Sequence, residues 1–332
     1  MRIALDAMGT DAAPVSEVEG AIRALRELDD DLEIVLVGDP VLIEAELARH
    51  DGVPMDRLSV VAARERVSAK DPPATVVRRK PDSSIAVGLR LHREGEVDAF
   101  ISAGSTGAVM AASLFILRPL PGVERPSVGT FFPTAGAPTL LLDAGTNVDC
   151  KPRHLVQFAH LGRVYMADVR GVESPRIGLL NIGEEPEKGD ELAQETHRLL
   201  AADPTLNFVG NIEGREIVKG ACDVLVADGF AGNVLLKFYE SVAQFILGMV
   251  RKELAKADDA PSLDPVMRLL DYSEYGGAPL LGVDGVTIIC HGGSPPKAIR
   301  NAVRVAAQAV RNDMVADMAA ELGGERTSGE TA

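Results

Sequence analysis

Seven short segments of this 332-residue chain combine glycine with small polar residues directly after an aliphatic run. They are DAMGTD (6–11), SAGSTG (102–107), DAGTNVD (143–149), NIGEEPEKGD (181–190), GNIEGRE (210–216), ADGFAGN (227–233) and CHGGSPPKA (290–298). Glycine lets the backbone approach a ligand closely, and a helix that follows presents unpaired N–H groups to an anion. The pattern indicates binding of phosphate by backbone amides. Ordinary turn chemistry is the alternative for several of the seven.

SAGSTG is the strongest anion-binding candidate among these segments. Ser105 or Thr106 can cap the following helix, and their hydroxyls with neighbouring N–H groups can bind phosphate oxygens. A plain helix cap is the alternative reading of the same two residues. We place Gly104, Ser105, Thr106 and Gly107 in the phosphate-binding set, together with Asn147 of DAGTNVD.

Lys188 is a candidate catalytic residue because of its position. It stands just before a helix predicted to start near residue 190, where the helix dipole disfavours a cation. A lysine placed there suits an anion held between the ammonium group and the helix. The alternative is a solvated cluster in which Glu184, Glu185 and Glu187 neutralise it.

Asn233 is the second candidate catalytic residue, and it closes ADGFAGN at the predicted start of a long apolar helix. It can cap that helix, or its amide can donate to a phosphate or a developing oxyanion. Asp6 and Gly9 of DAMGTD and His291 of CHGGSPPKA complete the candidate set. His291 can act as an acid or base, although a local hydrogen-bonding role explains it equally simply.

Several functional classes are excluded or disfavoured by motif and composition. No segment has the P-loop spacing or a GxGxxG after a strand, so ATP and classical dinucleotide sites are not supported. The three Cys are widely spaced without a Cys/His cluster, and we predict no metal and no cofactor. The formal net charge of −15 and the aromatic content of 4% argue against nucleic acid as a partner.

The elements that must position these residues alternate between short aliphatic runs and helical patterns, which is typical of a mostly parallel α/β sheet covered on both faces. Strands are predicted at 3–5, 33–37, 58–61, 99–102, 139–143, 176–181, 207–210, 224–227 and 286–290. Helices are predicted at 15–28, 40–49, 84–94, 106–117, 153–166, 190–201, 232–256 and 296–318. In a parallel sheet the seven glycine-rich strand ends share one edge.

We expect one catalytic domain with two lobes over residues 1–320, a projecting helical arm at about 232–282 and a flexible tail at 321–332. A second short helix in the arm is predicted at 266–270. The first residues enter a strand directly, which argues against a signal peptide. The apolar stretch 231–250 includes Lys237 and Glu240, which argues against a membrane span. A cytoplasmic location follows as an expectation.

Nine blocks in order strongly resemble the PlsX-type phosphate acyltransferases of bacterial phospholipid synthesis. They are DAMGTDAAP, RRKPDSS, SAGSTGAVMA, LLDAGTNVDCKP, LLNIGEEPEKG, GNIEGREI, VADGFAGNVLLK, DYSEYGGAPLLGV and HGGSPPKAIRNAV, from residue 1 to about 310. The chain departs from the family pattern at Thr10 and Ser105, where we expect Gly and Asn, and in GGSPP after His291.

The resemblance implies a three-layer α/β/α fold like that of isocitrate and isopropylmalate dehydrogenases, and a homodimer. It implies transfer of a fatty acyl group from acyl-carrier protein to inorganic phosphate, giving acyl phosphate for a glycerol-3-phosphate acyltransferase. Peripheral membrane contact is also implied, with the apolar arm at 247–281 as the candidate surface, although dimer packing explains the same residues. An NAD(P)-dependent decarboxylating dehydrogenase and a non-catalytic carrier-protein or membrane scaffold are the rival functions.

Overall fold

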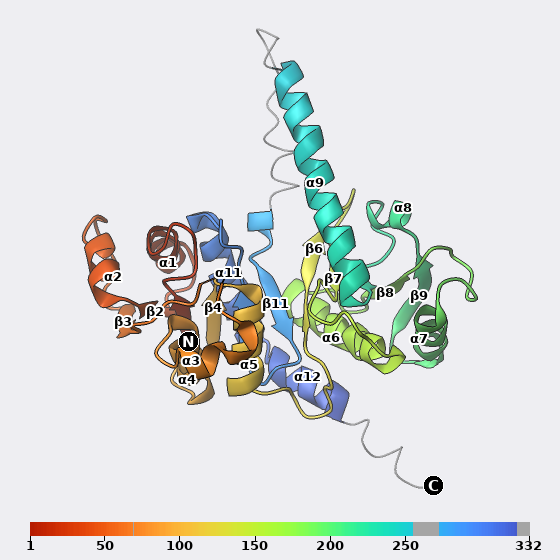
Figure 1. The fold of residues 1–332 in the computed structure, drawn as a ribbon, viewed down its shortest axis with the longest axis horizontal. Helices are drawn as coiled ribbons and strands as arrows, with labels where there is room; N and C mark the ends of the chain where they lie inside the picture. Colours follow the sequence, from red (N-terminus) through yellow and green to blue (C-terminus); the bar gives the residue numbers. More distant parts are fainter. Residues whose placement is uncertain (69, 255–271, 324–332) are drawn as a thin grey trace. The chain divides into compact units, whose positions relative to one another are not determined.

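The computed structural model describes residues 1–68, 70–254 and 272–323, which form two compact units (Figure 1). Unit 1 comprises Met1–Val128, Val164–Glu173 and the described residues from Ser273 onward, and unit 2 comprises the described residues of Gly129–Arg163 and Ser174–Tyr272. Residues of helix α6 (Pro152–Arg170) belong to both units.

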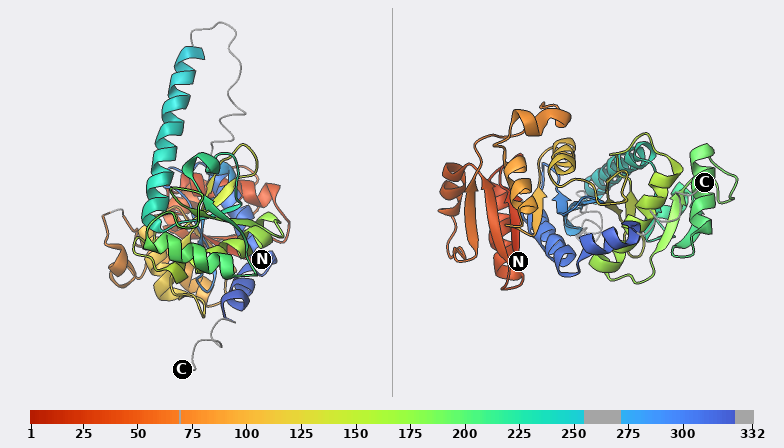
Figure 2. Two further views of the ribbon diagram at one scale, coloured as in Figure 1. Left: turned by 90° about the vertical axis from the view of Figure 1, so that its right-hand side faces the viewer. Right: turned by 90° about the horizontal axis from the view of Figure 1, so that it is seen from below.

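Unit 1 is built on a seven-stranded sheet with helices on both faces (Figure 2). The strand order is β3 (Leu58–Ala62), β2 (Glu33–Gly38), β1 (Arg2–Asp6), β4 (Ala99–Ser102), β12 (Val286–Ile289), β11 (Ala278–Leu281) and β5 (Ser127–Val128). The first five strands run parallel, and β11 is antiparallel to both of its neighbours. The central strands are buried along almost their whole length, which explains their continuous aliphatic sequences.

Helices pack in pairs against this sheet and fix where its strand ends lie. Helix α1 (Val15–Glu27) packs on α11 (Pro296–Arg311), and α4 (Ser84–Arg93) packs on α5 (Thr106–Ile116). A buried apolar cluster that includes Phe100, Ile85 and Val109 lies between β4, α4 and α5. The remaining described elements of unit 1 are α2 (Pro40–Leu47), η1 (Pro73–Thr75), α3 (Val76–Arg79), η2 (Tyr272–Glu274, which starts at the last residue of unit 2) and α12 (Met314–Gly323).

Unit 2 is built on a five-stranded sheet. Its order is β6 (Thr130–Phe132), β7 (Thr139–Leu142), β10 (Val224–Val226), β8 (Arg176–Leu180) and β9 (Asn207–Ile212), with only β6 antiparallel. Its other helices are α7 (Glu191–Ala202), α8 (Gly214–Ile217) and α9 (Gly229–Leu254). Helix α9 runs beyond the sheet of its own unit (Figure 1). Among the described helices, none combines the length and the apolar character needed to cross a bilayer.

The structure confirms the α/β fold class and all nine predicted strands, and it adds β5, β6 and β11. The predicted helix 296–318 is wrong as a single element, because the chain breaks between α11 and α12. Asp313, with a φ of 52°, adopts the left-handed conformation there. Helix α12 continues to Gly323, and the predicted helix 266–270 lies outside the described residues.

The expectation of a single shared sheet edge is also wrong. Three of the glycine-rich segments follow β1, β4 and β12 in unit 1, and the other four follow β7, β8, β9 and β10 in unit 2. Local sequence identifies a strand by its apolar run, but strand pairing depends on contacts between distant segments. The sequence pattern of apolar runs therefore could not predict that the strands divide into two sheets.

Candidate functional site

The three strand-end segments of unit 1 pack directly against one another. The Asp11 N–H donates to the Gly292 carbonyl oxygen over 2.8 Å, which joins DAMGTD to CHGGSPPKA. A Cβ at Gly9 would lie 2.8 Å from the backbone nitrogens of Ala103 and Gly104. Only glycine permits this approach of DAMGTD to SAGSTG. These contacts therefore bring together the segments that contain Asp6, Gly9, Gly104–Gly107 and His291.

The buried carboxylate of Asp6 holds two of these loops through hydrogen bonds. Its Oδ1 accepts from the Met8 N–H at 3.0 Å, and its Oδ2 accepts from the Ser102 hydroxyl at 2.6 Å. The Ser102 oxygen in turn accepts from the Gly104 N–H at 3.0 Å. Burial raises the pKa of Asp6, against the hydrogen bonds from Ser102 and Ser84 that lower it. The carboxyl is buried, so Asp6 positions the backbone of SAGSTG.

SAGSTG leaves the start of α5 open to a ligand. Ser105 occupies the position before the helix, but its hydroxyl accepts no hydrogen bond from the helix N–H groups. The predicted side-chain cap at Ser105 is therefore not made. Gly104, Ser105 and Gly107 are half-buried and Thr106 is exposed. The amides at this end suit an oxyanion, because the first N–H groups of a helix have no partner within it.

Glu17 supports the same neighbourhood and was missed at the sequence level. Its two carboxylate oxygens accept from the Thr10 N–H at 2.7 Å and the Thr10 hydroxyl at 2.9 Å. The side chain is fully buried, and this burial raises its pKa to about 7. A usable signal existed: Glu17 stands on the same face of α1 as Ala21 and Ala24, where an apolar residue is expected.

His291 has a local role in the structure. It is exposed, and its Nδ1 accepts a hydrogen bond from the Gly293 N–H at 3.0 Å. This contact matches the local hydrogen-bonding alternative. Its part in acid–base chemistry stays a prediction.

In unit 2, Asp143 organises the DAGTN turn after β7. Its Oδ1 accepts from the N–H groups of Gly145 and Thr146, both at 3.1 Å. Its Oδ2 accepts from the Asn147 N–H at 2.6 Å and from the Asn147 side-chain amide at 2.7 Å. That amide also donates to the Thr146 hydroxyl at 3.1 Å. Both amide hydrogens of Asn147 are thus engaged within the turn.

Asn233 lies beside this turn, on α9. The helix begins at Gly229, and Asp228 caps it by accepting from the Ala231 N–H at 2.8 Å. The predicted capping role of Asn233 is therefore wrong, because the residue lies in the second helical turn. Its side chain is exposed, and a Cβ at Gly145 would lie 3.1 Å from the Asn233 Cβ.

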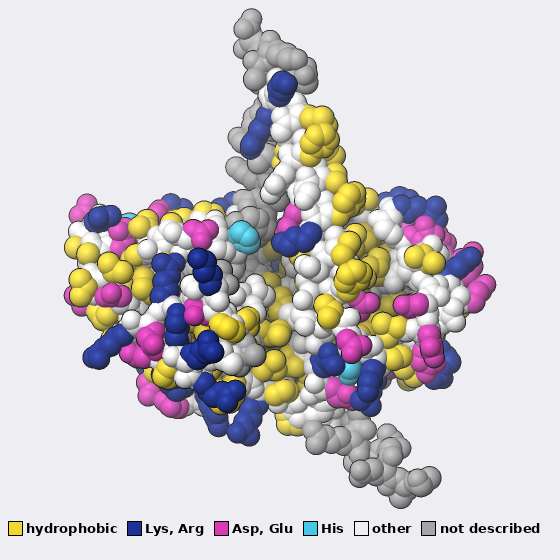
Figure 3. Space-filling model, in the orientation of Figure 1, with side chains coloured by type: hydrophobic (Ala, Val, Ile, Leu, Met, Phe, Trp, Pro, Cys, Tyr) yellow, Lys and Arg dark blue, Asp and Glu magenta, His cyan; other side chains and the backbone are white. Residues whose placement is uncertain are grey.

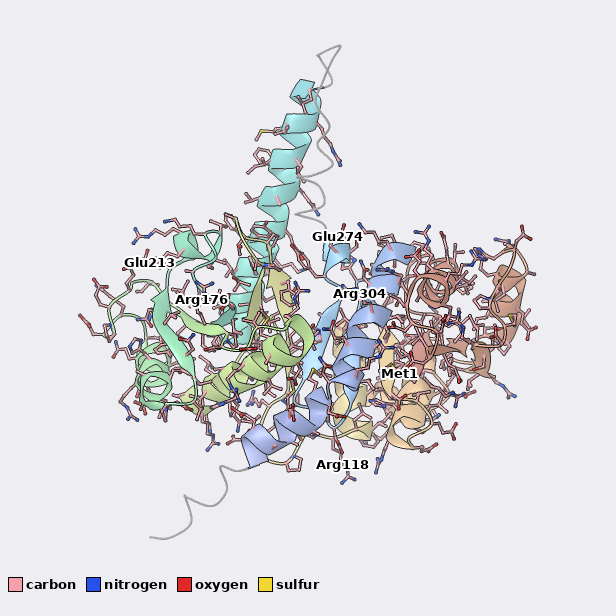
Figure 4. The ribbon with its side chains drawn as sticks, turned by 180° about the vertical axis from the view of Figure 1, so that it is seen from behind. Met1, Arg118, Arg176, Glu213, Glu274 and Arg304 are labelled. Carbon is pink, nitrogen blue, oxygen red and sulfur yellow. The ribbon has the colours of Figure 1, made fainter. Side chains whose placement is uncertain are left out.

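Lys188 is exposed on the loop between β8 and α7. Asp190 caps α7 by accepting from the Ala193 N–H at 2.9 Å, so Lys188 stands two residues before the cap. Within the described part of the chain its ammonium group makes no ion pair or hydrogen bond, and Glu184 pairs with Arg215 instead. The neutralised cluster is thus not formed. Figure 4 labels Glu213, which also pairs with Arg215 and caps the start of α8.

Two of the three cysteine side chains, those of Cys222 and Cys290, are buried. Burial raises the pKa of Cys222 and of Cys290 to about 12, so neither thiol is an available nucleophile at neutral pH. Over residues 1–68, 70–254 and 272–323, no group of three or more His, Cys, Asp and Glu is arranged to hold a metal ion.

Solved structures share the fold of this chain at low sequence identity. A phosphotransacetylase from Staphylococcus aureus aligns with a TM-score of 0.61 at 17% identity, covering 93% of this chain and 94% of that one. A branched-chain phosphotransacylase from Enterococcus faecalis has a TM-score of 0.58 at 15% identity, covering 93% and 99%. A protein named "a putative 4-hydroxythreonine-4-phosphate dehydrogenase" from Salmonella typhimurium has a TM-score of 0.53 at 13% identity, covering 92% and 98%. These similarities establish the three-layer α/β/α fold.

Curated relatives are far closer in sequence. The chain is 48% identical over 333 residues to a phosphate acyltransferase of Heliobacterium modesticaldum, covering 98% of each chain. It is 49% identical over 323 residues to a phosphate acyltransferase of Synechocystis, covering 94% and 92%. The profile of the family described as "Fatty acid synthesis protein" matches residues 1–317. This chain therefore belongs to that family, the PlsX-type phosphate acyltransferases, and it is an acyltransferase.

Proposed function

We propose that this acyltransferase moves a fatty acyl group from the thioester of acyl-carrier protein to inorganic phosphate. The observation that supports the acceptor best is the open start of α5, where SAGSTG offers backbone N–H groups and no side-chain cap. The names of the curated relatives point to the same acceptor. The carrier-bound donor and the acyl phosphate product are parts of the proposal.

The reaction needs no nucleophile from the protein. A phosphate oxygen attacks the thioester carbonyl carbon, and the resulting tetrahedral intermediate expels the carrier's sulfur. The C–S bond breaks, the new C–O bond gives acyl phosphate, and the departing thiolate takes up, through water, the proton that hydrogen phosphate releases. A buried thiol whose pKa is raised to about 12, as for Cys222 and Cys290, has no part in this scheme.

Each candidate residue has a distinct task in the proposal. Gly104–Gly107 bind phosphate and orient it, a contribution made through proximity. Lys188, in unit 2, is proposed to supply a positive charge to an anionic substrate group, and its ammonium group has no ion-pair partner in the described residues. Asn233 donates to the oxyanion of the tetrahedral intermediate, a contribution of about 2.7–4 kcal/mol per donor.

The test is incubation of the unmodified protein with a fatty acyl-carrier protein and labelled phosphate. We expect labelled acyl phosphate and free carrier thiol in equal amounts, and no loss of thioester when phosphate is left out. Carrier binding without phosphate-dependent loss of the thioester would favour a scaffold. Reduction of NAD or NADP by hydroxy-acid substrates, followed at 340 nm, would favour a dehydrogenase; the wavelength is the ordinary absorbance of the reduced nicotinamide.

We also propose that the protein is a cytoplasmic homodimer joined through α9. Exposed apolar side chains recur along this helix and form a stripe in Figure 3, including Phe230, Val234, Phe238, Phe245 and Met249. A stripe of this size on an acidic chain is costly to leave in water. Peripheral membrane contact is the competing use of the same surface. A glycerol-3-phosphate acyltransferase would consume the acyl phosphate.

A further inference from the structure

The segment between β3 and the end of α4 has the opposite charge to the rest of the chain. Residues 64–93 include eight Lys or Arg and three Asp or Glu, in a chain whose formal net charge is −15. Figure 3 shows Lys and Arg side chains gathered over α3 and α4. An imbalance of this kind on one surface attracts a partner of opposite charge.

Some of these cations hold the segment in shape. The Lys80 ammonium donates to the Asp71 carboxylate at 2.7 Å and to the Arg66 carbonyl at 2.8 Å. This contact lowers the pKa of Asp71 to about 2. The Glu65 N–H donates to the Asp82 carbonyl at 3.1 Å, so the start of this segment lies beside the residues that precede α4.

Four of the other cations lack an ion-pair partner among the described residues. Arg64, Lys70, Arg78 and Arg79 are exposed, and their side chains make no ion pair or hydrogen bond with any described residue. We name these four residues the basic patch. Several arginines elsewhere are paired with carboxylates, as in Arg198–Glu195 at 2.5 Å and Arg215–Glu184 at 3.2 Å. An acidic chain offers many such partners, so four uncompensated cations on one short segment need an explanation outside the chain.

The basic patch adjoins the phosphate-binding loop of the same unit. Helix α3 and η1, the turn before it, pack on α5. A Cβ at Gly107 would lie 3.1 Å from Pro73 Cγ, which places the patch segment against the last residue of SAGSTG. On its other side the Arg66 guanidinium donates to the Thr10 carbonyl at 2.8 Å. The segment thus touches both loops that surround the open start of α5.

We propose that the basic patch is the docking surface for the acidic face of the acyl-carrier protein, an inference that rests on the proposed acyl transfer. The carrier is a small acidic protein whose acyl thioester hangs on a long flexible arm. Docking beside Gly107 lets this arm deliver the thioester to the phosphate-binding loop. The uncompensated charge explains recognition of the protein part of the donor, which the loop itself does not contact.

The test compares acyl-carrier protein with acyl-pantetheine, which has the same thioester but no protein surface. For the double variant Arg78→Glu and Arg79→Glu we expect the KM for acyl-carrier protein to rise about tenfold or more, because rim charges govern encounter. The KM for acyl-pantetheine, the KM for phosphate and the kcat should stay within about twofold. Raising ionic strength should increase the KM for acyl-carrier protein more for the unmodified protein than for the variant.

A matched pair controls for charge change alone. Lys70→Glu and Lys219→Glu make the same substitution at exposed lysines without side-chain partners among the described residues. We expect only Lys70→Glu to weaken carrier binding, measured directly by fluorescence anisotropy with a labelled carrier. Thermal unfolding of all variants should match the unmodified protein.

Three results would overturn the docking surface while leaving acyl transfer intact. They are equal carrier affinity in all variants, an equal rise in KM for acyl-pantetheine, and a loss confined to binding of anionic phospholipid vesicles. By contrast, an unmodified protein that binds the carrier through the patch but never forms acyl phosphate would overturn the proposed function.

Discussion

At the scale of single residues, the aspartates that follow the strands build the loops instead of facing a ligand. Asp6 and Asp143 are buried and accept backbone N–H groups of the segment that follows, and Asp228 caps α9. The carboxylate at each of these strand ends therefore fixes the backbone of the loop or helix that follows it. Lys188 and Asn233 differ from these residues because both are exposed.

Replacing Lys188 by Ala should cut turnover by about a hundredfold or more, if the ammonium group stabilises charge in the transition state. The fold should be unaffected, because the ammonium group makes no ion pair or hydrogen bond within the described residues. Steady-state rates with acyl-carrier protein and phosphate, together with a thermal melt, measure both effects. Lys219→Ala is the matched control, and an unchanged rate for Lys188→Ala would remove the residue from the mechanism.

Glu17 makes stability depend on pH. Its pKa is raised from 4.5 to about 7, so between these values the folded protein keeps a proton that the unfolded chain has released. The contribution of Glu17 to the free energy of unfolding is therefore fully present below pH 4.5 and is lost as pH rises through 7. The loss is about 3 kcal/mol.

The variant Glu17→Gln stays neutral and should not show this loss. Urea unfolding at about pH 5 and about pH 8 should find the variant gaining stability relative to the unmodified protein as pH rises. Parallel pH profiles for the two proteins would contradict the raised pKa.

At the scale of elements, close approaches of loop and helix fix the candidate residues in place. A Cβ at Gly232 would lie 2.0 Å from the Asp143 carbonyl oxygen, so the first turn of α9 presses directly on the turn after β7. This contact places Asn233 beside Gly145. In unit 1, Gly9 does the same for DAMGTD and SAGSTG.

Gly232→Ala should therefore destabilise the protein by about 1–3 kcal/mol through overpacking. It should also slow turnover, because the clash moves α9 away from the DAGTN turn. Gly248→Ala on the same helix is the control: a Cβ there meets nothing within 4 Å, and the change should stabilise by up to about 1 kcal/mol. Denaturant unfolding of both variants measures the contrast, and equal effects would show that the packing at Gly232 is unimportant.

At the scale of the whole molecule, exposed apolar surface on α9 indicates assembly. Phe238 is 68% exposed and Phe245 is 65% exposed, which is unusual for large aromatic side chains. We expect the unmodified protein to sediment as a dimer. The double variant Phe238→Ser and Phe245→Ser should sediment with the mass of one chain, because the apolar contact is lost.

The control for sedimentation is Gln244→Ser, an exposed polar position between the two phenylalanines. It should leave the dimer intact. A monomeric unmodified protein, or a dimer that survives both Phe substitutions, would show that α9 is not the dimer contact. Binding to phospholipid vesicles by a monomer would then favour the membrane.

The sequence by itself determined the buried strands, most of the helices and the glycine-rich segments. Each of these features depends on the periodicity or composition of a short stretch of chain. The sequence also identified the family through nine ordered blocks. The strands β5, β6 and β11 were missed. The same holds for the break at Asp313 between α11 and α12.

Only the tertiary structure decided how the strand ends divide between two sheets and what each polar group there does. Asn233 could be a helix cap until Asp228 was seen to hold that position, and Glu17 was not predicted as part of the site until Thr10 was found against it. Likewise, the sequence leaves the run at Arg78 and Arg79 as either a solvated face or a dock for an acidic carrier, and the packing of their segment on α5 supports the proposed docking. The physical reason is common to all: a hydrogen bond or a burial joins residues far apart in the chain, and local sequence does not record which distant group will be the partner.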